Sequence, residues 1–135
     1  MKIKEQWIMW EPLSKLRGDF YIESVIDDYY SGFKIIISDH NNKGKKFYIK
    51  FKLGADAYRS TDELYAWAMQ KDFLRDGSYF YKVINSKYIQ WLSDISNDVS
   101  KAVRPNMQHF VIVSQDSTLE LLNGSEPEIE FINES

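Results

Sequence analysis

Candidate catalytic and metal-binding residues are few in this 135-residue chain, which has two histidines and no cysteine. His40 follows Asp39 in a polar run, and His109 opens an apolar segment. A metal site needs at least three convergent ligands, and a catalytic histidine needs an orienting group beside a substrate. Asp27-Asp28 and Asp39-His40 would lie about 20 Å apart along the predicted hairpin, too far to share one ion. The lack of cysteine excludes disulfides, thiolate catalysis and iron–sulfur clusters. We therefore expect no catalytic residues, no metal and no cofactor.

Motifs for phosphate binding and nucleophilic catalysis are also missing. The six glycines are isolated from one another, so they cannot form a glycine-rich phosphate loop. No serine lies in a nucleophile-elbow pattern. A phosphate at the helix start predicted near Ser60 would meet Asp62 and Glu63, which already complement the helix dipole. We expect the chain not to be an enzyme, and an enzyme without a local signature is the third hypothesis.

A lysine-rich segment is the best candidate for binding nucleic acid or a small ligand. Its outward side chains alternate with Phe47, Ile49 and Phe51, which we expect in the core. The pI of about 5.4 is well below that of a typical nucleic-acid-binding domain. We favour a solvated face that discourages edge pairing. Ligand or nucleic-acid binding is the alternative function, and it would be carried by Lys46, Tyr48, Lys50 and Lys52.

Charge is distributed unevenly along the chain, whose net charge is −3. Residues 1–53 carry a balance of +3, residues 54–135 a balance of −6, and the last twenty residues contain no basic side chain. Such an acidic region attracts a basic partner and repels nucleic acid, although charge also serves solubility alone. The candidate partner-binding residues are Asp116, Glu120, Glu126, Glu128 and Glu130.

Aromatic residues are abundant, with eight Phe, nine Tyr and four Trp. Large aromatic side chains help a small domain to build a sufficient core, so we expect most of them to be buried. Tyrosine and tryptophan also dominate protein interfaces. Exposed tyrosines would therefore indicate a binding surface.

Three strands are predicted in the first half of the chain. Apolar and polar residues alternate over 19–28, 33–38 and 46–53. Turn-forming residues at 29–32 and 39–44 separate them, and Gly32 can adopt the positive φ of a tight turn. Short connections of this kind predict a three-stranded antiparallel meander.

The second half of the chain mixes helices and strands. Ser60 to Glu63 has the pattern of a capping box and predicts a helix that ends before Gly77, and Asn85 or Ser86 caps a second helix reaching Ile95. Strands are predicted at 79–84, 108–114 and 118–122, the last two as a hairpin, with an edge strand at 128–132 and a loop at 97–106. The fold class is α+β: the meander plus the C-terminal hairpin in a mostly antiparallel sheet, with two helices, in one domain of residues 1–135.

Several segments together resemble a group of small, uncharacterised bacterial single-domain proteins. These segments are Trp10-Glu11-Pro12-Leu13, Tyr21-Ile22 with Asp27-Asp28, residues 57–63, Tyr81-Lys82-Val83 with Asn85-Ser86, Tyr88 and Trp91, Glu120-Leu121-Leu122, and Glu126-Pro127-Glu128. Such proteins are similar to the immunity proteins that accompany secreted or contact-delivered toxins. The resemblance implies an inhibitor that acts by binding, and it assigns no site residues.

These observations together predict a cytoplasmic protein-binding domain and, through the resemblance, an immunity protein that neutralises a bacterial toxin by direct contact. The partner would be a protein, such as a basic toxin domain, and the pairing of two copies in a homodimer stays open. Nucleic acid is disfavoured as a partner. A membrane partner is not expected, because no apolar run is long enough to span a bilayer and the first residues lack a secretory pattern.

Overall fold

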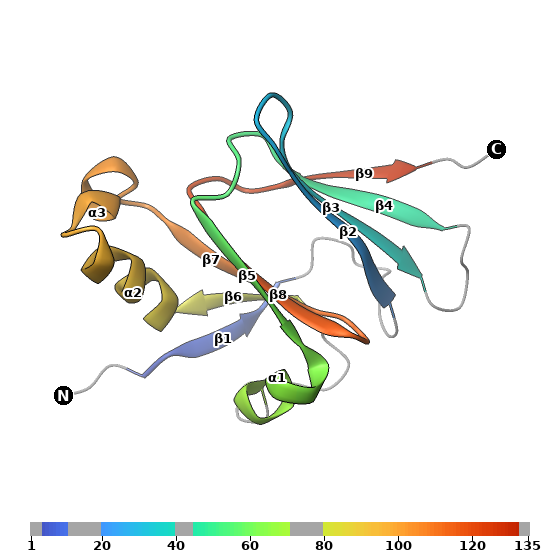
Figure 1. The fold of residues 1–135 in the computed structure, drawn as a ribbon, viewed down its shortest axis with the longest axis horizontal. Helices are drawn as coiled ribbons and strands as arrows, with labels where there is room; N and C mark the ends of the chain where they lie inside the picture. Colours follow the sequence, from blue (N-terminus) through green and yellow to red (C-terminus); the bar gives the residue numbers. More distant parts are fainter. Residues whose placement is uncertain (1–3, 11–19, 40–44, 71–79, 133–135) are drawn as a thin grey trace.

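The structure is a computed structural model that describes residues 4–10, 20–39, 45–70 and 80–132. In these residues two antiparallel sheets pack face to face, and helices border one of them (Figure 1). The α+β class with mostly antiparallel strands is confirmed. The strands divide between two sheets, which local alternation of residues does not encode.

The four-stranded sheet has the order β2-β3-β4-β9. Its strands are β2 (Phe20–Asp28), β3 (Gly32–Asp39), β4 (Lys46–Phe51) and β9 (Glu128–Ile132). The predicted meander is confirmed, because β3 pairs with both β2 and β4 along most of its length. The predicted C-terminal edge strand is confirmed too, and it lies antiparallel to β4.

The five-stranded sheet has the order β1-β6-β7-β8-β5. Its strands are β1 (Gln6–Met9), β5 (Ala57–Asp62), β6 (Phe80–Ile84), β7 (Gln108–Val113) and β8 (Ser117–Asn123). The predicted hairpin of β7 and β8 is present at its centre. The two outer strands, β1 and β5, were not predicted from the sequence.

The capping box predicted at Ser60 is wrong. Ser60 and Thr61 belong to β5, where they pair with Leu119 and Thr118 of β8. The helix starts later, at Glu63, and the side chain of Asp62 accepts a hydrogen bond from the Leu64 amide at 2.9 Å. Pairing with a neighbouring strand therefore overrides a local helix-start signal, since β8 supplies a ladder of backbone hydrogen bonds.

The main core lies between the two sheets. Alternate residues of β3 and β4 face inward, and they meet alternate residues of β6, β7 and β8. Because each strand presents every second side chain to this layer, the alternation seen in the sequence becomes one apolar interface. Its fully or almost fully buried members are Phe20, Phe33, Ile35, Ile37, Phe47, Ile49, Phe51, Phe80, Phe110, Ile112, Leu119 and Leu121.

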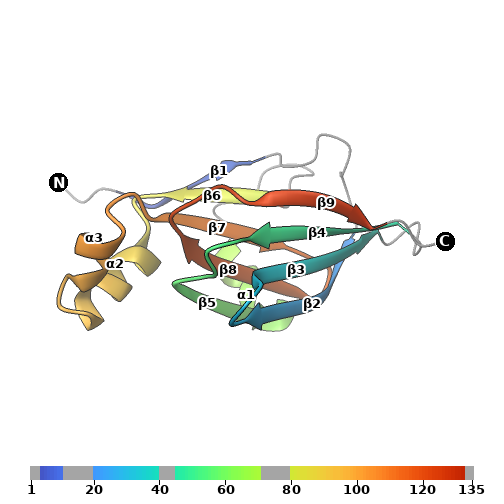
Figure 2. The same cartoon turned by 90° about the horizontal axis from the view of Figure 1, so that it is seen from above.

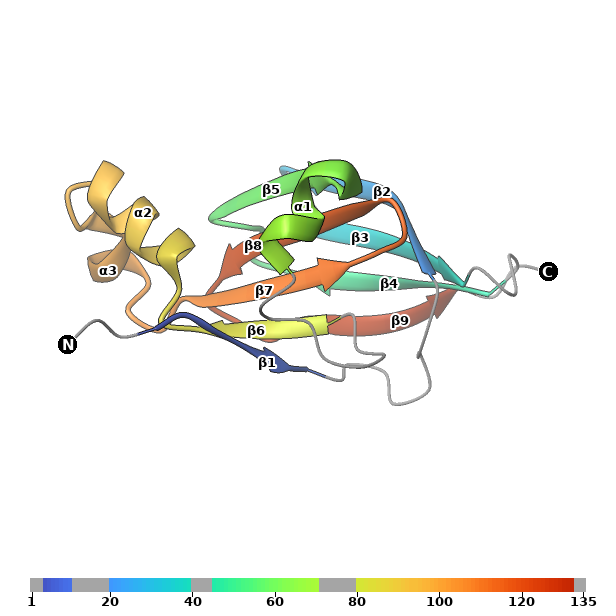
Figure 3. The ribbon, with the colours of Figure 1, turned by 90° about the horizontal axis from the view of Figure 1, so that it is seen from below.

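The opposite face of the five-stranded sheet carries a second apolar cluster and the helices. The cluster comprises Trp7, Tyr81, Val83, Val111 and Val113. Helix α1 (Glu63–Gln70) lies across this face, as Figure 3 shows, while α2 (Lys87–Ile95) and α3 (Val99–Val103) stand at one end of the sandwich (Figure 2). None of the helices in the described part of the chain is long and apolar enough to cross a membrane.

Helix α2 begins where the sequence predicts. Ser86 is its N-cap, and the Ser86 side chain accepts a hydrogen bond from the Ile89 amide at 3.0 Å. Helix α3 lies within the segment predicted to be a loop, and Asn97 and Asp98, both with positive φ, form the turn before it. The part of the first predicted helix after residue 70 lies outside the described residues.

Candidate functional site

The lysine-rich segment and the acidic C-terminal segment, predicted as alternative binding surfaces, lie side by side. Strand β9 pairs with β4 so that Glu128 is opposite Lys50 and Glu130 is opposite Tyr48. The Lys50 ammonium contacts the Glu130 carboxylate at 2.5 Å, and the Lys52 ammonium contacts that of Glu128 at 2.9 Å. Each surface therefore neutralises much of the charge of the other.

The other residues of the predicted lysine-rich and acidic surfaces either form ion pairs elsewhere or lie apart from these strands. Lys46 lies 3.2 Å from the carboxylate of Glu23 on β2. Glu126 forms an ion pair with Lys82 of β6. Asp116 is exposed in the turn between β7 and β8. A phosphate approaching the lysines would have to compete with carboxylates already in place, which weakens the nucleic-acid alternative.

Glu120, the fifth predicted partner-binding residue, is not at the surface. Its side chain is 1% exposed and points to the helix-bearing face of the five-stranded sheet. Two guanidinium nitrogens of Arg59 on β5 donate to its carboxylate, Nε at 2.6 Å and Nη2 at 3.0 Å. The ring of His109 on β7 contacts the same carboxylate through Nε2 at 3.0 Å. Glu120 therefore has no free oxygen to offer a partner.

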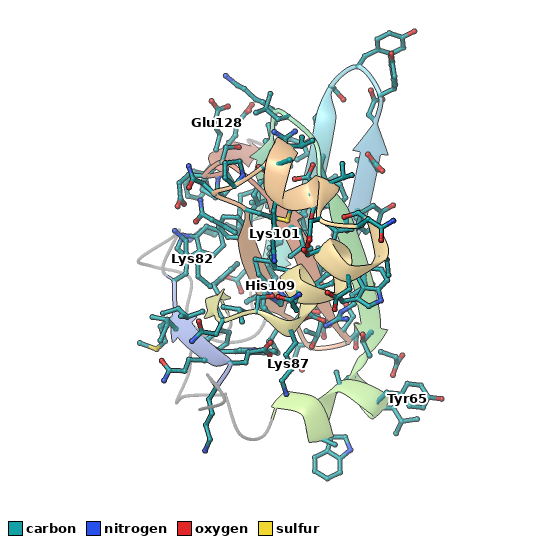
Figure 4. All side chains as sticks on the ribbon, turned by 90° about the vertical axis from the view of Figure 1, so that its left-hand side faces the viewer. Tyr65, Lys82, Lys87, Lys101, His109 and Glu128 are labelled. Carbon is teal, nitrogen blue, oxygen red and sulfur yellow. The ribbon has the colours of Figure 1, made fainter. Side chains whose placement is uncertain are left out.

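The network continues from His109 to helix α2. The other ring nitrogen of His109, Nδ1, lies 2.7 Å from the Ser86 hydroxyl. Because an ionised carboxylate can only accept, Nε2 is the donor to Glu120, and the Ser86 hydroxyl can donate to Nδ1. Figure 4, viewed from the end that carries α2 and α3, shows His109 near the centre of the molecule. Strands β5, β7 and β8 and helix α2 are thus joined through one buried chain of hydrogen bonds.

Tyr88 and Glu5 complete the surroundings of this network. The Arg59 guanidinium lies 4.1 Å from the centre of the Tyr88 ring, and the same ring meets His109 edge-on at 5.4 Å between centroids. The Glu5 carboxylate accepts a hydrogen bond from the Lys87 amide at 2.6 Å. An anion therefore already occupies the start of α2, where the helix dipole favours negative charge.

The electrostatics keep Glu120 and Arg59 ionised at neutral pH. Burial raises the pKa of the Glu120 carboxyl, but hydrogen bonds from His109 and Arg59 outweigh it, so that the net shift is downward. The hydrogen bond to Glu120 raises the pKa of Arg59. Burial raises the pKa of the Tyr88 hydroxyl. Arg59 and Glu120 thus form a charged pair at the edge of the interior.

The order Ser86–His109–Glu120 is that of a hydrolase relay with the two ring nitrogens exchanged. Here, however, the serine oxygen already accepts the Ile89 amide hydrogen as a helix cap, and His109 is 1% exposed. The amide of Lys87, which could stabilise an oxyanion, is bound to Glu5. These contacts equip the network to hold α2 on the sheet. Within the described ranges, no group of three or more His, Asp or Glu side chains could hold a metal ion, and His40 lies outside them.

A different feature stands out at the surface, namely exposed aromatic side chains. Seven in the described residues are at least 44% exposed. They are Tyr29, Tyr30, Tyr58, Tyr65, Trp67, Trp91 and Phe131. The prediction that most aromatic residues serve the core therefore holds for the phenylalanines on the inner strands but not for these side chains.

Some of these exposed rings have partners within the fold and some do not. Tyr58, Trp91 and Phe131 each pack against a more buried ring. Tyr29 and Tyr30 contact only one another, at 5.0 Å between centroids, among the rings that the structure describes. Tyr65 and Trp67 of α1 have no ring contact with any described residue, and Figure 4 shows Tyr65 at the edge of the molecule. These four rings are therefore candidates for contact with another molecule.

The buried network was not predicted from the sequence, and Glu120, which we expected at the surface, is buried. One signal could have found it: Glu120 and His109 each lie in a strongly apolar strand segment. A charged residue that is buried in such a segment needs a partner of opposite charge or a hydrogen-bond donor. The partner, Arg59, is 61 residues away in the sequence, and no local pattern identifies it. Comparisons of the chain with family models, curated proteins and solved structures gave no match.

Proposed function

We propose that this chain is a non-enzymatic domain that binds another protein, and that its role is to neutralise a bacterial toxin by direct contact. The observation that carries the proposal is the exposure of tyrosine and tryptophan side chains that do not pack within the described fold. Tyr29 and Tyr30 are 94% and 93% exposed, and Tyr65 is 72% exposed. Because these rings bury little of their area on folding, their presence is better explained by an intermolecular contact.

The distribution of charge supports a protein partner over a nucleic acid. The lysines of β4 contact carboxylates of β2 and β9. Displacing those carboxylates would cost much of what a phosphate contact gains. The net charge of −3 is instead suited to a basic protein. The toxin-neutralising role rests on the sequence resemblance to immunity proteins.

The buried network is consistent with a binding protein, because it holds the sheet and α2 together as a scaffold for surface residues. Its serine, histidine and carboxylate satisfy one another and the start of α2. A rigid support lowers the entropy that surface side chains lose when a partner binds. The buried network therefore has a structural role that requires no catalytic reaction.

The proposal is tested by purifying the tagged chain from its native cells at moderate salt and identifying any stoichiometric partner. We expect a basic protein that high salt releases, that is toxic when expressed alone and that co-expression of this chain makes harmless. A cell line expressing the tag alone is the control. Failure to retain any protein from the native cells would contradict the proposal.

A matched variant separates this outcome from the nucleic-acid alternative. The double substitution Lys50→Gln with Lys52→Gln removes two cations at and just after the end of β4 and keeps polar side chains there. We expect unchanged binding to the protein partner. The nucleic-acid alternative would be favoured if the wild-type chain bound a single-stranded DNA oligonucleotide but no protein, and if the double variant lost the DNA binding.

A further inference from the structure

The turn between β2 and β3, which we name the hairpin tip and define as Asp27–Gly32, carries the two most exposed aromatic side chains of the described residues. We infer that the hairpin tip is the recognition element, and that Tyr29 and Tyr30 insert into a concave, positively charged site on a protein partner. This inference rests on the proposed protein-binding function. It names the residues that make the central contact and the charge of the partner surface that they bind.

Folding gives no reason for two tyrosines at this position. Both rings stand almost entirely in solvent, and Figure 1 shows the β2–β3 connection projecting beyond the sandwich. A tight turn is usually built from small polar residues and glycine, which suit its backbone conformation. Tyr29 and Tyr30 bring neither turn propensity nor buried area. In contrast, paired tyrosines with neighbouring serine and glycine are the composition that antibody loops use for protein recognition.

The hairpin tip is held in one conformation before any partner binds. One oxygen of the Asp28 carboxylate accepts hydrogen bonds from the amides of Tyr30 and Ser31, both at 2.8 Å. These two bonds lower the pKa of Asp28, so that the carboxylate stays ionised and keeps the turn closed. A preorganised turn loses little conformational entropy on binding, which leaves more of the contact energy for affinity.

Gly32 anchors the other side of the turn. Its φ is +86°, and a Cβ atom at this position would lie 2.5 Å from the backbone oxygen of Phe51 on β4. Any side chain would therefore be strained in conformation and would collide with the neighbouring strand. The close approach of backbones fixes where the hairpin leaves the sheet, and hence where the tyrosines project.

Charge at the hairpin tip indicates the kind of partner. Asp27 and Asp28 place two exposed carboxylates beside the rings, and the cation that acts on Asp28 is Lys34 of β3. The Lys34 ammonium also lies 6.0 Å from the centre of the Tyr48 ring, on the outer face of the sheet. The hairpin tip is therefore convex, aromatic and net negative. Its complement is a cleft lined by lysine or arginine, which bind both carboxylates and aromatic faces.

The inference can be tested before the partner is known, because the tip accepts a photoreactive residue of similar shape. We would introduce Tyr30→benzoylphenylalanine in the native cells and irradiate them, with Tyr65→benzoylphenylalanine as the matched position on α1. The expected result is an adduct with one basic protein at position 30 and none, or much less, at position 65. An adduct with an acidic protein would overturn the predicted charge of the partner site.

Binding of the purified partner then decides the role of the tyrosines. We expect Tyr29→Ser combined with Tyr30→Ser to weaken binding at least about 30-fold, the loss typical of central interface residues. Ile95→Ser, at an exposed position of α2, is the control and is expected to change affinity by less than about 3-fold. Thermal unfolding of the double tip variant should match the wild type, because neither tip ring packs against another described element.

The outcomes distinguish this inference from the proposed function. If the partner binds the double variant as tightly as the wild type, the hairpin tip is not the recognition element, although protein binding stands. If Tyr65→Ser abolishes binding and the tip variant does not, the contact lies on α1 and the inference is overturned. If the wild-type chain binds no protein at all, the proposed function itself fails.

Discussion

Glu120 and Glu130 are chemically identical, and each makes an ion pair with a cation on a neighbouring strand. Glu120 is 1% exposed and bonded to both Arg59 and His109, whereas Glu130 is 58% exposed and bonded to Lys50. A carboxylate removed from water needs its partners, while one in water is already well solvated. From this comparison we expect the stability of the fold to depend more on the buried network than on the β4–β9 pairs.

The two regions also differ in what they connect. The buried network joins three strands of one sheet to the start of α2. Both sets of contacts join strands that already share a ladder of backbone hydrogen bonds, but only the buried network also reaches a helix. Loss of the buried network should therefore affect a tertiary contact that no other interaction replaces, whereas loss of a surface pair should leave the sheet intact.

The largest effect is expected from Glu120→Gln, which leaves Arg59 without its anion. Breaking a buried ion pair from one side typically costs about 3 kcal/mol in the free energy of unfolding. Urea denaturation followed by circular dichroism measures the loss. Glu128→Gln, at an exposed position in the other region, is the matched control. Equal losses in the two variants would contradict the distinction between the regions.

Ser86→Ala should have the next largest effect, because one hydroxyl both caps α2 and bonds His109. We expect a loss of about 2 kcal/mol, the sum of a missing N-cap and an unpaired buried ring nitrogen. Ser60→Ala tests the cap predicted from the sequence, and it should change stability by less than about 0.5 kcal/mol. A larger loss of stability for Ser60→Ala than for Ser86→Ala would contradict this assignment and indicate that Ser60 caps a helix.

Acid should weaken the buried network in a defined pH range. The folded-state pKa of Glu120 lies below its ordinary value of 4.5, so its contribution is complete above that pH and is lost as the pH falls through the folded value. The stability difference between the wild type and Glu120→Gln should therefore shrink below pH 4.5, by at most about 1.4 kcal/mol for each pH unit. Urea midpoints at constant ionic strength between pH 6 and pH 3 measure it. A difference independent of pH would contradict this reasoning.

The smallest effect is expected at the surface. Glu130→Gln should lower the free energy of unfolding only slightly at low salt, as is usual for an exposed ion pair, and not measurably in 1 M salt. The loss caused by Glu120→Gln should persist at both salt concentrations, since a buried pair is poorly screened. Denaturation of both variants at the two ionic strengths sharpens the comparison. A salt-independent loss at Glu130 would mean that this surface pair also shapes the fold.

Local patterns were sufficient where an element depends mainly on its own residues. Alternation over 19–28 and 46–53 predicted the strands β2 and β4, and on β4 each second side chain does reach the core. Ser86 was recognised as a cap candidate because its bond reaches only three residues ahead. In contrast, β5 carries a helix-start pattern and became a strand, because β8 offered it a partner.

The candidate sites show the same division. The acidic and basic surfaces were recognised from composition, but each was expected to be free. Glu130 reaches Lys50 across 80 residues, and Glu120 reaches Arg59 across 61. Sequence alone cannot say that these side chains meet, since their distance depends on the order of strands in two sheets.

The sequence by itself determined the fold class, most strands, the cap of α2 and an unusual supply of tyrosine and tryptophan, because these follow from composition and short-range periodicity. Only the tertiary structure decided which charges are neutralised, which carboxylate is buried and which tyrosines stay in solvent. The physical reason is that burial and ion pairing are properties of distant segments brought together. Tyr29 and Tyr30 illustrate this: a strand pattern places them in a turn, and only the packed sheets show that no other part of the described fold covers them.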